Sequence, residues 1–494
     1  MLSFRVLVTD EVDPQGVELL RSHPSLIVDE RPTRPWRDLL GEIGEYDAIV
    51  GRSATQIPGE LLRAAKKLRV IGRAGVGTDN IDLETATALG IAVINAPAGN
   101  TIAVAELFFG VLVSLVRHLP RAYASMTAGK WDRSKLLGTE LRGRTLGIVG
   151  LGRIGGEVSS RARAFGMRVI AYDPYLARER FELLRVERLS QLGDLLDQAD
   201  VVTVHTPLTD ETRGMIGAAE LARLHAGAIV MNMARGGIVN EDALRAALES
   251  GHLRGAVLDV YAKEPLAPDH PFRTMANVIL TPHLGASTAE GQRNVAVDAC
   301  IAVRDALLSG ALAGAVNLAD VDREQWKEMG GALRLARHSA AIARAMLADS
   351  GAPAIGQVTV HVGSQLAGAD SLLVASAAEG ALAPITGEVR VNLINARARA
   401  AERGIAIATL PAGDAAEPYA VRVTMSSDGR ALTVGGAALP GGPPRLTRIG
   451  DFKVDVTPRR TLIVLTNADV PGVIGRVGTV LGNAGLNIAE YHQA

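Results

Sequence analysis

The sequence has very little cysteine and no surplus of charge. Cys300 is the only cysteine among 494 residues, which excludes intrachain disulfides and cysteine-rich metal sites. No metal site of any other kind is expected. A lone cysteine also suits a reducing compartment, and we expect a cytoplasmic protein. The formal net charge is −1, whereas nucleic acids and anionic membranes attract proteins with a clear basic excess. We therefore expect neither as a partner.

Long apolar runs are also missing. The longest candidate, LFFGVLVSLV, ends at Arg117, short of the roughly 18 residues that a membrane-spanning helix needs. The amino-terminal stretch MLSFRVLVTDEVDP carries charge too early for a signal peptide, and its apolar run is too short. Hydrophobic residues nevertheless make up 48% of the chain, enough to bury several cores. These features predict about two to four domains of a soluble enzyme or binding protein.

Strand-like and helical runs alternate along most of the chain. The runs FRVLVTD, LIVDE, YDAIVGRSAT, LRVIGRAG and IAVINAPAG form a first series of strands to about residue 99. A helix is expected from about Thr101 to Leu119, and a second series of strands follows from TLGIVGLG to NVILTPH. This alternation predicts mostly parallel sheets. The expected fold class is α/β, with two doubly wound, Rossmann-like sheets flanking a cleft.

The character of the sequence changes near ALAGAVNLADVD. The sequence there contains an alanine-rich helical segment, the strand QVTVHVGS and turns rich in glycine and proline such as ALPGGPP. These features predict a separate α+β accessory domain. The last run, TLIVLTNADVPGVIGRVGTVLGNAGLNIAEYHQA, is predicted to form a strand, a turn, a helix and a further strand.

The strongest local motif lies in GIVGLGRIGGEV. Gly150, Gly152 and Gly155 form G-x-G-x-x-G between a predicted strand and a predicted helix, where backbone amides and a helix amino terminus can hold a pyrophosphate. Such turns also occur for steric reasons alone. Asp173, at the end of the next strand, favours dinucleotide binding because its carboxylate can accept hydrogen bonds from ribose hydroxyls. That carboxylate would repel a 2′-phosphate, so the expected cofactor is NAD rather than NADP.

A bound nicotinamide implies hydride transfer, for which the protein must handle a proton and orient the substrate. His283, in NVILTPHLGAST, follows a strand end, where open α/β sheets bind ligands, and imidazole suits acid-base work near neutral pH. Glu264, in VYAKEPLA, follows the preceding strand and can orient the imidazole. Arg235, in NMARGG, can bind a substrate carboxylate in bidentate fashion. Each has an ordinary structural alternative as a surface or loop residue, but three at successive strand ends argue against coincidence.

The motifs GLGRIG, VHTPLT, MARGGIVNEDAL, LDVYAKEP and TPHLGAST, in this order, resemble the D-isomer-specific 2-hydroxyacid dehydrogenases. The catalytic arginine, glutamate and histidine of that family match Arg235, Glu264 and His283. GRSAT, RAGVGTDNID, ASMTAGKWDR and GTELRG narrow the resemblance to members that oxidise D-3-phosphoglycerate to 3-phosphohydroxypyruvate with NAD, the first step of phosphorylated L-serine biosynthesis. The resemblance covers about residues 4–315 and continues more loosely through an accessory domain to a regulatory ACT-type domain.

The resemblance implies further cofactor and substrate contacts. The substrate carboxylate is expected near the backbone of Gly75 and Gly77, with Asn100 close by. Arg52 is the candidate for the substrate phosphate, because a dianion calls for a cation, although an ordinary surface arginine remains the alternative. Besides the motif glycines and Asp173, the expected NAD contacts are Val76, Arg153, Ile154, Thr206, Met233, Ala234, Arg235, Asp259, His283, Leu284, Gly285 and Ala286.

The resemblance also implies domains and assembly. Relatives dimerise through their nucleotide domains, and a tryptophan matching Trp131 enters the partner, so Arg133 is expected to reach the substrate phosphate of a neighbouring subunit in a homodimer or homotetramer. The expected domains are a substrate-binding domain of residues 1–98 and 286–316, an inserted NAD-binding domain of 99–285, an accessory domain of 317–455 and a partial ACT-type domain of 456–494.

The predicted ACT-type segment supplies only about half of the strands and helices of a complete domain. The residues that match the serine site of relatives are Asp469 and Asn487, although the first can equally be a turn-forming device. We therefore expect weak or absent inhibition by L-serine. An uncovered strand from Leu486 to Tyr491 is expected to promote association.

Two other functions remain open at this point. A glyoxylate or hydroxypyruvate reductase of the same family shares the catalytic residues but has no need to bind phosphate. An NAD-sensing, corepressor-like binding protein keeps the nucleotide site, but Arg235, Glu264, His283 and Arg52 then have no evident use.

Overall fold

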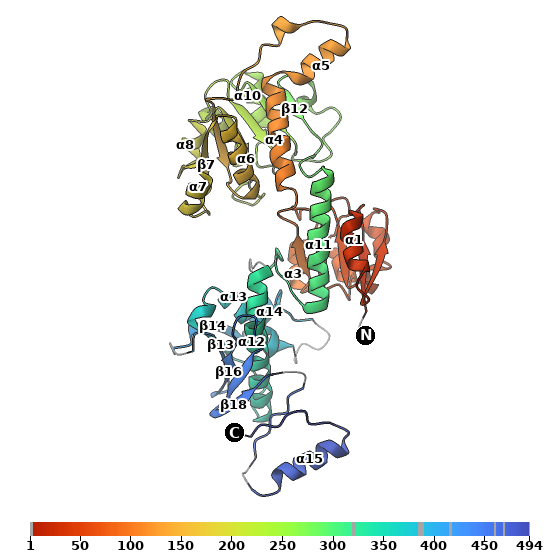
Figure 1. The fold of residues 1–494 in the computed structure, drawn as a ribbon, viewed down its shortest axis with the longest axis vertical. Helices are drawn as coiled ribbons and strands as arrows, with labels where there is room; N and C mark the ends of the chain where they lie inside the picture. The colour runs from red at the N-terminus through yellow and green to blue at the C-terminus, as the bar shows by residue number, and fades with distance from the viewer. Residues whose placement is uncertain are drawn as a thin grey trace.

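The computed structural model describes residues 3–318, 323–383, 390–413, 417–458, 461–467 and 470–493. Within them the chain builds three sheets, and Figure 1 shows these sheets following one another along the long axis of the molecule. The prediction of an α/β fold with parallel, Rossmann-like sheets is confirmed. The exact domain boundaries stay a prediction.

The first sheet has the strand order β2-β1-β3-β4-β5, and every neighbouring pair is parallel. Its strands are nearly continuous apolar runs because helices cover both faces. Its elements are β1 (Phe4–Val8), α1 (Pro14–Arg21), β2 (Leu26–Glu30), the 3-10 turns η1 (Trp36–Leu39) and η2 (Ile43–Glu45), β3 (Ala48–Gly51), α2 (Gly59–Ala64), β4 (Val70–Arg73), α3 (Leu83–Ala88) and β5 (Ala92–Asn95).

The second sheet has the order β12-β11-β10-β9-β6-β7-β8 and is also parallel throughout. The order reverses between β6 and β9, which opens a crevice at the carboxyl ends of these strands. The elements are β6 (Thr145–Val149), α6 (Arg153–Ala164), β7 (Arg168–Tyr172), α7 (Arg178–Leu184), β8 (Glu187–Arg188), α8 (Leu192–Leu196), β9 (Val201–Val204), α9 (Ala218–Arg223), β10 (Ile229–Asn232), α10 (Glu241–Glu249), β11 (Gly255–Leu258), η4 (Pro271–Thr274) and β12 (Val278–Leu280).

Two long helices join these sheets. The chain leaves the first sheet through α4 (Thr101–Val116), which packs against α6 in the core of the second unit, and it returns through α11 (Ala289–Ser309), which packs against α1 and β4. Figure 1 shows both helices running between the two units. The two sheets are therefore connected by a pair of helices, and the sites at their strand ends face a shared junction.

The predicted helix from Thr101 to Leu119 is wrong at its carboxyl end. The helix α4 stops at Val116, because His118 adopts the left-handed conformation with a φ of 54°, and α5 (Leu119–Thr127) starts in a new direction with a proline in its first turn. A 3-10 turn, η3 (Arg133–Lys135), follows. In the described part of the chain no single helix is long and apolar enough to cross a membrane. The helices α4 and α5 together have the length and composition of a membrane span, but they are bent by 64° relative to each other.

The third sheet is mixed, with the order β14-β13-β15-β16-β17-β18, and only β13 and β14 pair in parallel. Two alanine-rich helices, α12 and α13, pack together and form a core with the sheet. The elements are α12 (Arg323–Asp349), β13 (Gln357–Val362), η5 (Ser364–Leu366), α13 (Asp370–Leu382), α14 (Ala396–Glu402), β14 (Ala406–Pro411), β15 (Ala420–Ser427), β16 (Arg430–Ala437), β17 (Arg445–Ile449) and β18 (Phe452–Val456).

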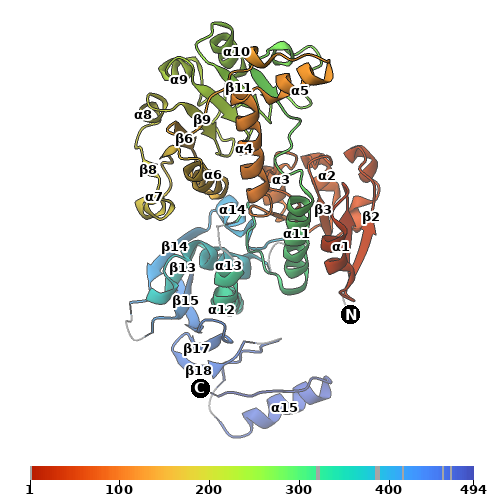
Figure 2. The ribbon, with the colours of Figure 1, turned by 45° about the horizontal axis from the view of Figure 1, so that its top comes forward.

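Polar side chains attach this third unit to the first sheet. Arg390 donates to the carbonyl of Leu68 at 2.6 Å, Asn392 to that of Gly90 at 2.7 Å, and Arg399 to that of Ala88 at 2.8 Å. Figure 2 shows α14 beside α3, where these contacts lie. The contact uses the carbonyl groups left free at helix ends and turns.

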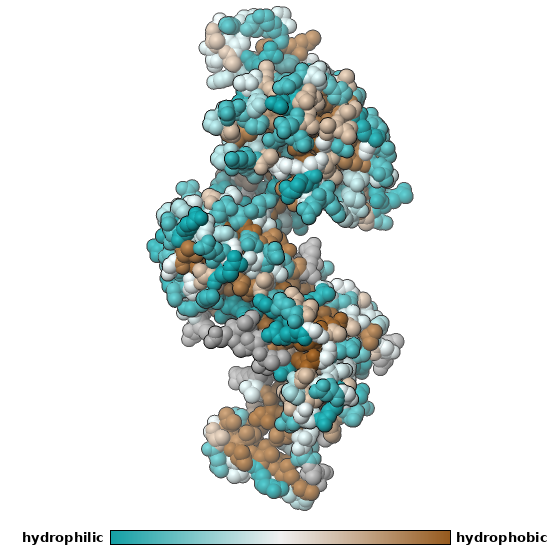
Figure 3. Space-filling model, turned by 180° about the vertical axis from the view of Figure 1, so that it is seen from behind, coloured by the Kyte–Doolittle hydropathy of each residue, from teal (hydrophilic) through white to brown (hydrophobic). Residues whose placement is uncertain are grey.

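The strands predicted for the last segment are wrong. The helix α15 (Val473–Asn483) forms, but the described residues on either side of it, 461–467 and 484–493, carry no strand. No residue of α15 is buried, and Figure 3 shows apolar side chains gathered at this end of the molecule. An isolated strand leaves its backbone groups unpaired, and in the described residues no neighbouring strand is present to pair with these two segments.

Candidate active site

His283 and Glu264 form a close pair at the carboxyl edge of the second sheet. Glu264 lies on the loop after β11 and His283 on the loop after β12, and their Oε2 and Nδ1 atoms are 2.8 Å apart. The contact occupies Nδ1 and leaves Nε2 for another partner, and the imidazole is half-exposed. The geometry gives a histidine in a fixed tautomer, able to exchange a proton with a bound molecule.

Asp259 holds the loop that carries the histidine. Its carboxylate accepts hydrogen bonds from the amides of Leu284, at 2.7 Å, and Gly285, at 2.9 Å, and from the hydroxyl of Thr281. Its carbonyl accepts from the amide of His283, whose φ is 56°. Asp259 is fully buried, so these bonds fix the loop from inside. Contact between Asp259 and NAD stays a prediction.

Tyr261 links the two loops of the pair. Its amide donates to Glu264 Oε1 at 3.1 Å, and its hydroxyl reaches the carbonyls of Leu258 and Thr281 at 3.0 and 2.9 Å. Burial, the largest cause, and the nearby Asp259 raise the pKa of Tyr261 to about 12. The phenol therefore keeps its proton at neutral pH and acts as a donor between strand ends.

Arg235 spans the junction between the two sheets. It follows β10, and its Nε donates to Asp79, on the loop after β4, at 3.1 Å, while Nη1 donates to the Ala234 carbonyl at 2.6 Å. Buried Asn232 supports the loop by donating to the Arg235 carbonyl at 2.8 Å. A Cβ atom at Gly77 would overlap the Arg235 guanidinium, which explains why glycine suits this position.

The first sheet contributes a cluster of positive charge. Arg52 follows β3 and Arg73 ends β4, its neighbour in the sheet, and sequence reasoning missed Arg73. Burial, the largest cause, with Arg235 and Arg52 nearby, lowers the pKa of Arg73 to about 10, which still leaves it charged at neutral pH. Its Nε is buried with no partner among the described residues. Three arginines therefore gather where the two sheets meet.

Asp10 shapes the loop of Arg52. Its buried carboxylate accepts from the amides of Arg52, at 2.9 Å, and Thr55, at 3.0 Å, and from the hydroxyls of Thr33 and Thr55. These bonds hold the Asp10 carboxylate inside the loop and fix the backbone at the strand end. The guanidinium of Arg52 is left to act as a cation at the strand end.

The glycine motif forms the turn that the sequence predicted. Gly152 begins α6 with open space where a Cβ would point, whereas a Cβ at Gly155 would overlap the Gly150 carbonyl. Asp173 follows β7, and its Oδ2 accepts from the amide of Leu151 at 2.9 Å. The acidic side chain thus lies against the glycine turn at the switch point of the sheet, as dinucleotide binding requires.

Several buried polar atoms lack partners among the described residues near these strand ends. They include Thr206 Oγ1 on the loop after β9, and Asn100 Oδ1 and Thr101 Oγ1 at the start of α4. A buried polar group without a partner is costly, so these atoms fit a bound polar molecule. The remaining predicted NAD contacts lie at other strand ends: Val76 after β4, Arg153 and Ile154 in the first turn of α6, Met233 and Ala234 after β10, and Leu284, Gly285 and Ala286 after β12.

His205 offers a contrast with His283. It follows β9 at the same edge of the sheet, but it is enclosed beside Phe108, and burial lowers its pKa to about 4. It is neutral at neutral pH, and its Nε2 lies 3.1 Å from the hydroxyl of buried Thr203. Of the two, only His283 is placed to meet a substrate.

Other predicted residues lie away from this cluster. Arg133 is exposed in η3, on the arm that Figure 1 shows beyond α5, far from the first sheet of the same chain. Asn487 is exposed on the segment after α15, and Asp469 lies outside the described residues.

The chain is similar in sequence to known NAD-dependent enzymes. Residues 109–285 match the NAD binding domain of the D-isomer specific 2-hydroxyacid dehydrogenases. The chain is 39% identical to a D-3-phosphoglycerate dehydrogenase of Archaeoglobus fulgidus, with 98% of this chain and 91% of that protein aligned. It is 36% identical to the enzyme of the same name from Bacillus subtilis, over the same shares of the two chains.

Solved structures match a smaller part of the chain. A glyoxylate reductase from Paecilomyes thermophila superposes with a TM-score of 0.59 and 31% identity, over 64% of this chain and 99% of the other. The TT0316 protein of Thermus thermophilus superposes with a TM-score of 0.57 and 37% identity, over 61% of this chain and 96% of the other. The phosphoglycerate enzymes match nearly the whole length, accessory unit included. The chain belongs to the D-3-phosphoglycerate dehydrogenases, within the D-isomer specific 2-hydroxyacid dehydrogenase family.

Proposed function

We propose that the protein oxidises D-3-phosphoglycerate to 3-phosphohydroxypyruvate with NAD, the reaction that begins the phosphorylated route to L-serine. The observation that carries the proposal is the His283–Glu264 pair, 2.8 Å apart, on the same sheet edge as Arg235 and opposite the arginines of the first sheet. A cytoplasmic location is part of the same proposal.

The roles follow from the chemistry of a 2-hydroxy acid. The glycine turn and Asp173 would hold NAD, which would supply the acceptor for the hydride on the carbon that carries the hydroxyl. His283 Nε2 takes the hydroxyl proton, and the Glu264 carboxylate stabilises the resulting imidazolium through Nδ1. Arg235 holds the substrate carboxylate and orients the reacting carbon, because a guanidinium forms two parallel hydrogen bonds with a carboxylate.

The phosphate explains the additional arginines. A substrate with a carboxylate and a phosphate brings at least two anionic groups, and a cluster of like charges is stabilised when such a group binds between them. Arg52 and Arg73 are the cations of the first sheet that lie near Arg235. An unphosphorylated 2-hydroxy acid would bring no second anion to Arg52 and Arg73, and Asp79 and Asp10 would be the acidic groups that remain near Arg73.

One assay separates the candidate reactions. The protein is mixed with NAD and D-3-phosphoglycerate, and NADH is followed by its absorbance, with D-glycerate as the matched substrate without phosphate. Turnover of the phosphorylated substrate alone is expected. Equal turnover of both would favour a glyoxylate or hydroxypyruvate reductase, and no turnover of either would favour an NAD-sensing binding protein.

A homodimer is part of the proposal. The arm after α4 exposes a series of large apolar side chains, with Trp131 79% and Leu137 86% exposed, as a surface buried by a second copy would. A dimer through this arm would bring Arg133 toward the neighbour's active site. Sedimentation velocity of the wild type against Trp131→Glu tests the interface, and a monomeric wild type would exclude it.

A further inference from the structure

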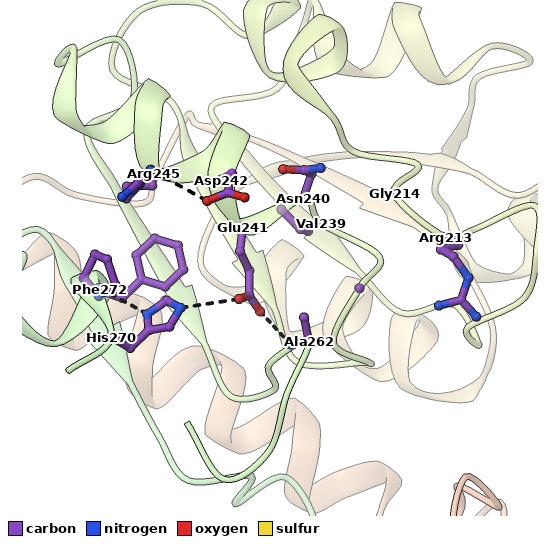
Figure 4. A pocket seen from close by; sticks show the side chains of 12 residues that line it. Arg213, Gly214, Val239, Asn240, Glu241, Asp242, Arg245, Ala262, His270 and Phe272 are labelled. Carbon is purple, nitrogen blue, oxygen red and sulfur yellow. Dashed lines mark hydrogen bonds and ion pairs between the residues drawn. The ribbon is translucent and has the colours of Figure 1, made fainter. Parts of the chain in front are cut away.

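The loop that carries Glu264 is held from its other side by Glu241. This residue begins α10, and its Oε1 accepts a hydrogen bond from the backbone amide of Ala262 at 2.6 Å. Figure 4 shows Glu241 reaching from the helix toward Ala262, with the His270 ring beside the same carboxylate. The bond crosses between the strand-end loops of β10 and β11, which carry Arg235 and Glu264.

The backbone of Glu241 is set by the helix cap at Asn240, and its carboxylate lies beside the His270 ring. Asn240 caps α10 by accepting from the amide of Ala243 at 2.9 Å, which sets the start of the helix. His270 Nδ1 accepts from the amide of Phe272 at 3.3 Å, so a neutral ring carries its proton on Nε2, which faces Glu241 Oε2 at 3.6 Å. Oε1 therefore accepts the Ala262 amide, while Oε2 faces the His270 ring beyond hydrogen-bonding distance.

A short chain of contacts runs from Glu241 to the reacting histidine. Next to Ala262, the amide of Tyr261 donates to Glu264 Oε1 at 3.1 Å, and Glu264 Oε2 meets His283 Nδ1 at 2.8 Å. The Arg235 loop is in direct contact with the same backbone, since a Cβ at Gly236 would overlap the carbonyl of Tyr261. The position of the Ala262 amide therefore affects both groups of the site.

A cavity of about 460 Å³ lies over this bond. Its lining includes Glu241, Ala262 and His270 together with Gly237 of the Arg235 loop. Ala262 is exposed, so solvent rather than packed side chains lies against this part of the loop. The bond to Glu241 therefore adds a restraint on the loop from the cavity side, besides the contact with Gly236.

We propose that Glu241 is a positioning residue, whose carboxylate holds the Ala262 amide so that Glu264 stays against His283. The inference rests on the proposed oxidation, because that reaction needs the histidine in one orientation. Loss of the tether allows the loop to shift, and a shift of about 1 Å at a reacting group can lower turnover by roughly 10²-fold. Since Glu241 acts through Glu264, we expect a smaller effect, about 10-fold on kcat.

Four variants test the proposal against D-3-phosphoglycerate. Glu241→Ala removes the acceptor and is expected to lower kcat about 10-fold with the KM for NAD unchanged. Glu241→Gln keeps an oxygen opposite the Ala262 amide and is expected to restore kcat to within about twofold. Asp242→Ala is the matched control, because its carboxylate is the next along the helix and is 96% exposed. If Glu241→Ala fails to fold, Glu241→Met fills the same volume without an acceptor.

Each outcome has a defined meaning. Equal kcat in Glu241→Ala and Asp242→Ala would overturn the proposal, as would a loss in Glu241→Gln as large as in Glu241→Ala. Wild-type protein that ignores phosphoglycerate but reduces glyoxylate would overturn the proposed function alone, and the same variants measured on glyoxylate would then decide the role of Glu241.

Discussion

The loops at the carboxyl edge of the second sheet and the segment around α15 have similar sequence patterns. The first region is tightly hydrogen-bonded, whereas the second is exposed and forms no strand in its described residues. Both contain apolar strand-like runs next to turns with Asp, Pro or Gly. At the sheet edge, buried carboxylates such as Asp259 fix the loops through several hydrogen bonds. Around α15, no residue of the helix is buried and the flanking described residues form no strand.

The difference shows where tertiary partners decide the structure. A strand-like run becomes a strand only when a neighbour pairs with its backbone groups, and a turn becomes a site only when its polar groups are satisfied from inside. The sheet edge meets both conditions. We therefore expect changes at the edge to alter catalysis and changes around α15 to leave it intact.

The largest effect is expected from His283→Asn. Asparagine can accept a hydrogen bond but cannot exchange a proton near neutral pH, so kcat should fall roughly 10²-fold or more. NAD affinity, measured by fluorescence titration, should stay close to the wild-type value because the glycine turn is untouched. His225→Asn, an exposed histidine of the same unit, serves as the control. Turnover within a few-fold of wild type would remove His283 from the mechanism.

The sequence predicted this edge well because its signals are local. Strand ends, the glycine turn and the order of Arg235, Glu264 and His283 can all be read from neighbouring residues, and a parallel sheet brings strand ends together. Arg73 was missed because nothing in GRAG distinguishes a buried arginine from an exposed one. Its proposed role rests on its burial and on the charges of Arg52 and Arg235 nearby.

The prediction of elements failed where the outcome depends on distant contacts. The break at His118 requires a left-handed residue between two apolar helical runs, which periodicity does not reveal. The strands around α15 required partners that the described residues do not supply. Glu241 was overlooked for a related reason, since an acidic residue in the first turn of a helix is common and its bond to Ala262 is a tertiary contact.

A smaller effect is expected at the arginine cluster. Arg73→Met and Arg52→Met keep side-chain volume but remove a cation, and losing a hydrogen bond to a charged group costs about 1.5–3 kcal/mol. The KM for D-3-phosphoglycerate should therefore rise roughly 10-fold or more in each variant. Arg63→Met on the exposed side of α2 is the control, and its KM should match that of the wild type. An unchanged KM in both variants would place the phosphate elsewhere.

Cofactor choice should respond more modestly. Asp173→Ala removes the carboxylate that lies beside the glycine turn, so NAD should bind several-fold more weakly, about 1 kcal/mol for a lost hydrogen bond. NADP should be affected less, because the repulsion of its 2′-phosphate disappears. The ratio of kcat/KM for the two cofactors is the measurement, and an unchanged ratio would mean that the ribose is read by another residue.

The smallest effect on catalysis is expected from removing the segment that contains α15. A chain ending at Pro458 lacks α15, but no residue of that helix is buried, so its removal uncovers no core. The kcat and the melting temperature should therefore match those of the full chain within error. The exposed apolar residues Ile474, Val480 and Leu486 favour self-association, which light scattering should show to fall in the shorter chain.

L-Serine titrated into the phosphoglycerate assay should inhibit neither protein, because exposed Asn487 lies on a segment without the strand that a serine site would need. Strong inhibition of the full chain that disappears in the shorter one would show that this segment builds an effector site when subunits pair, and the contrast with the sheet edge would then depend on assembly rather than on sequence.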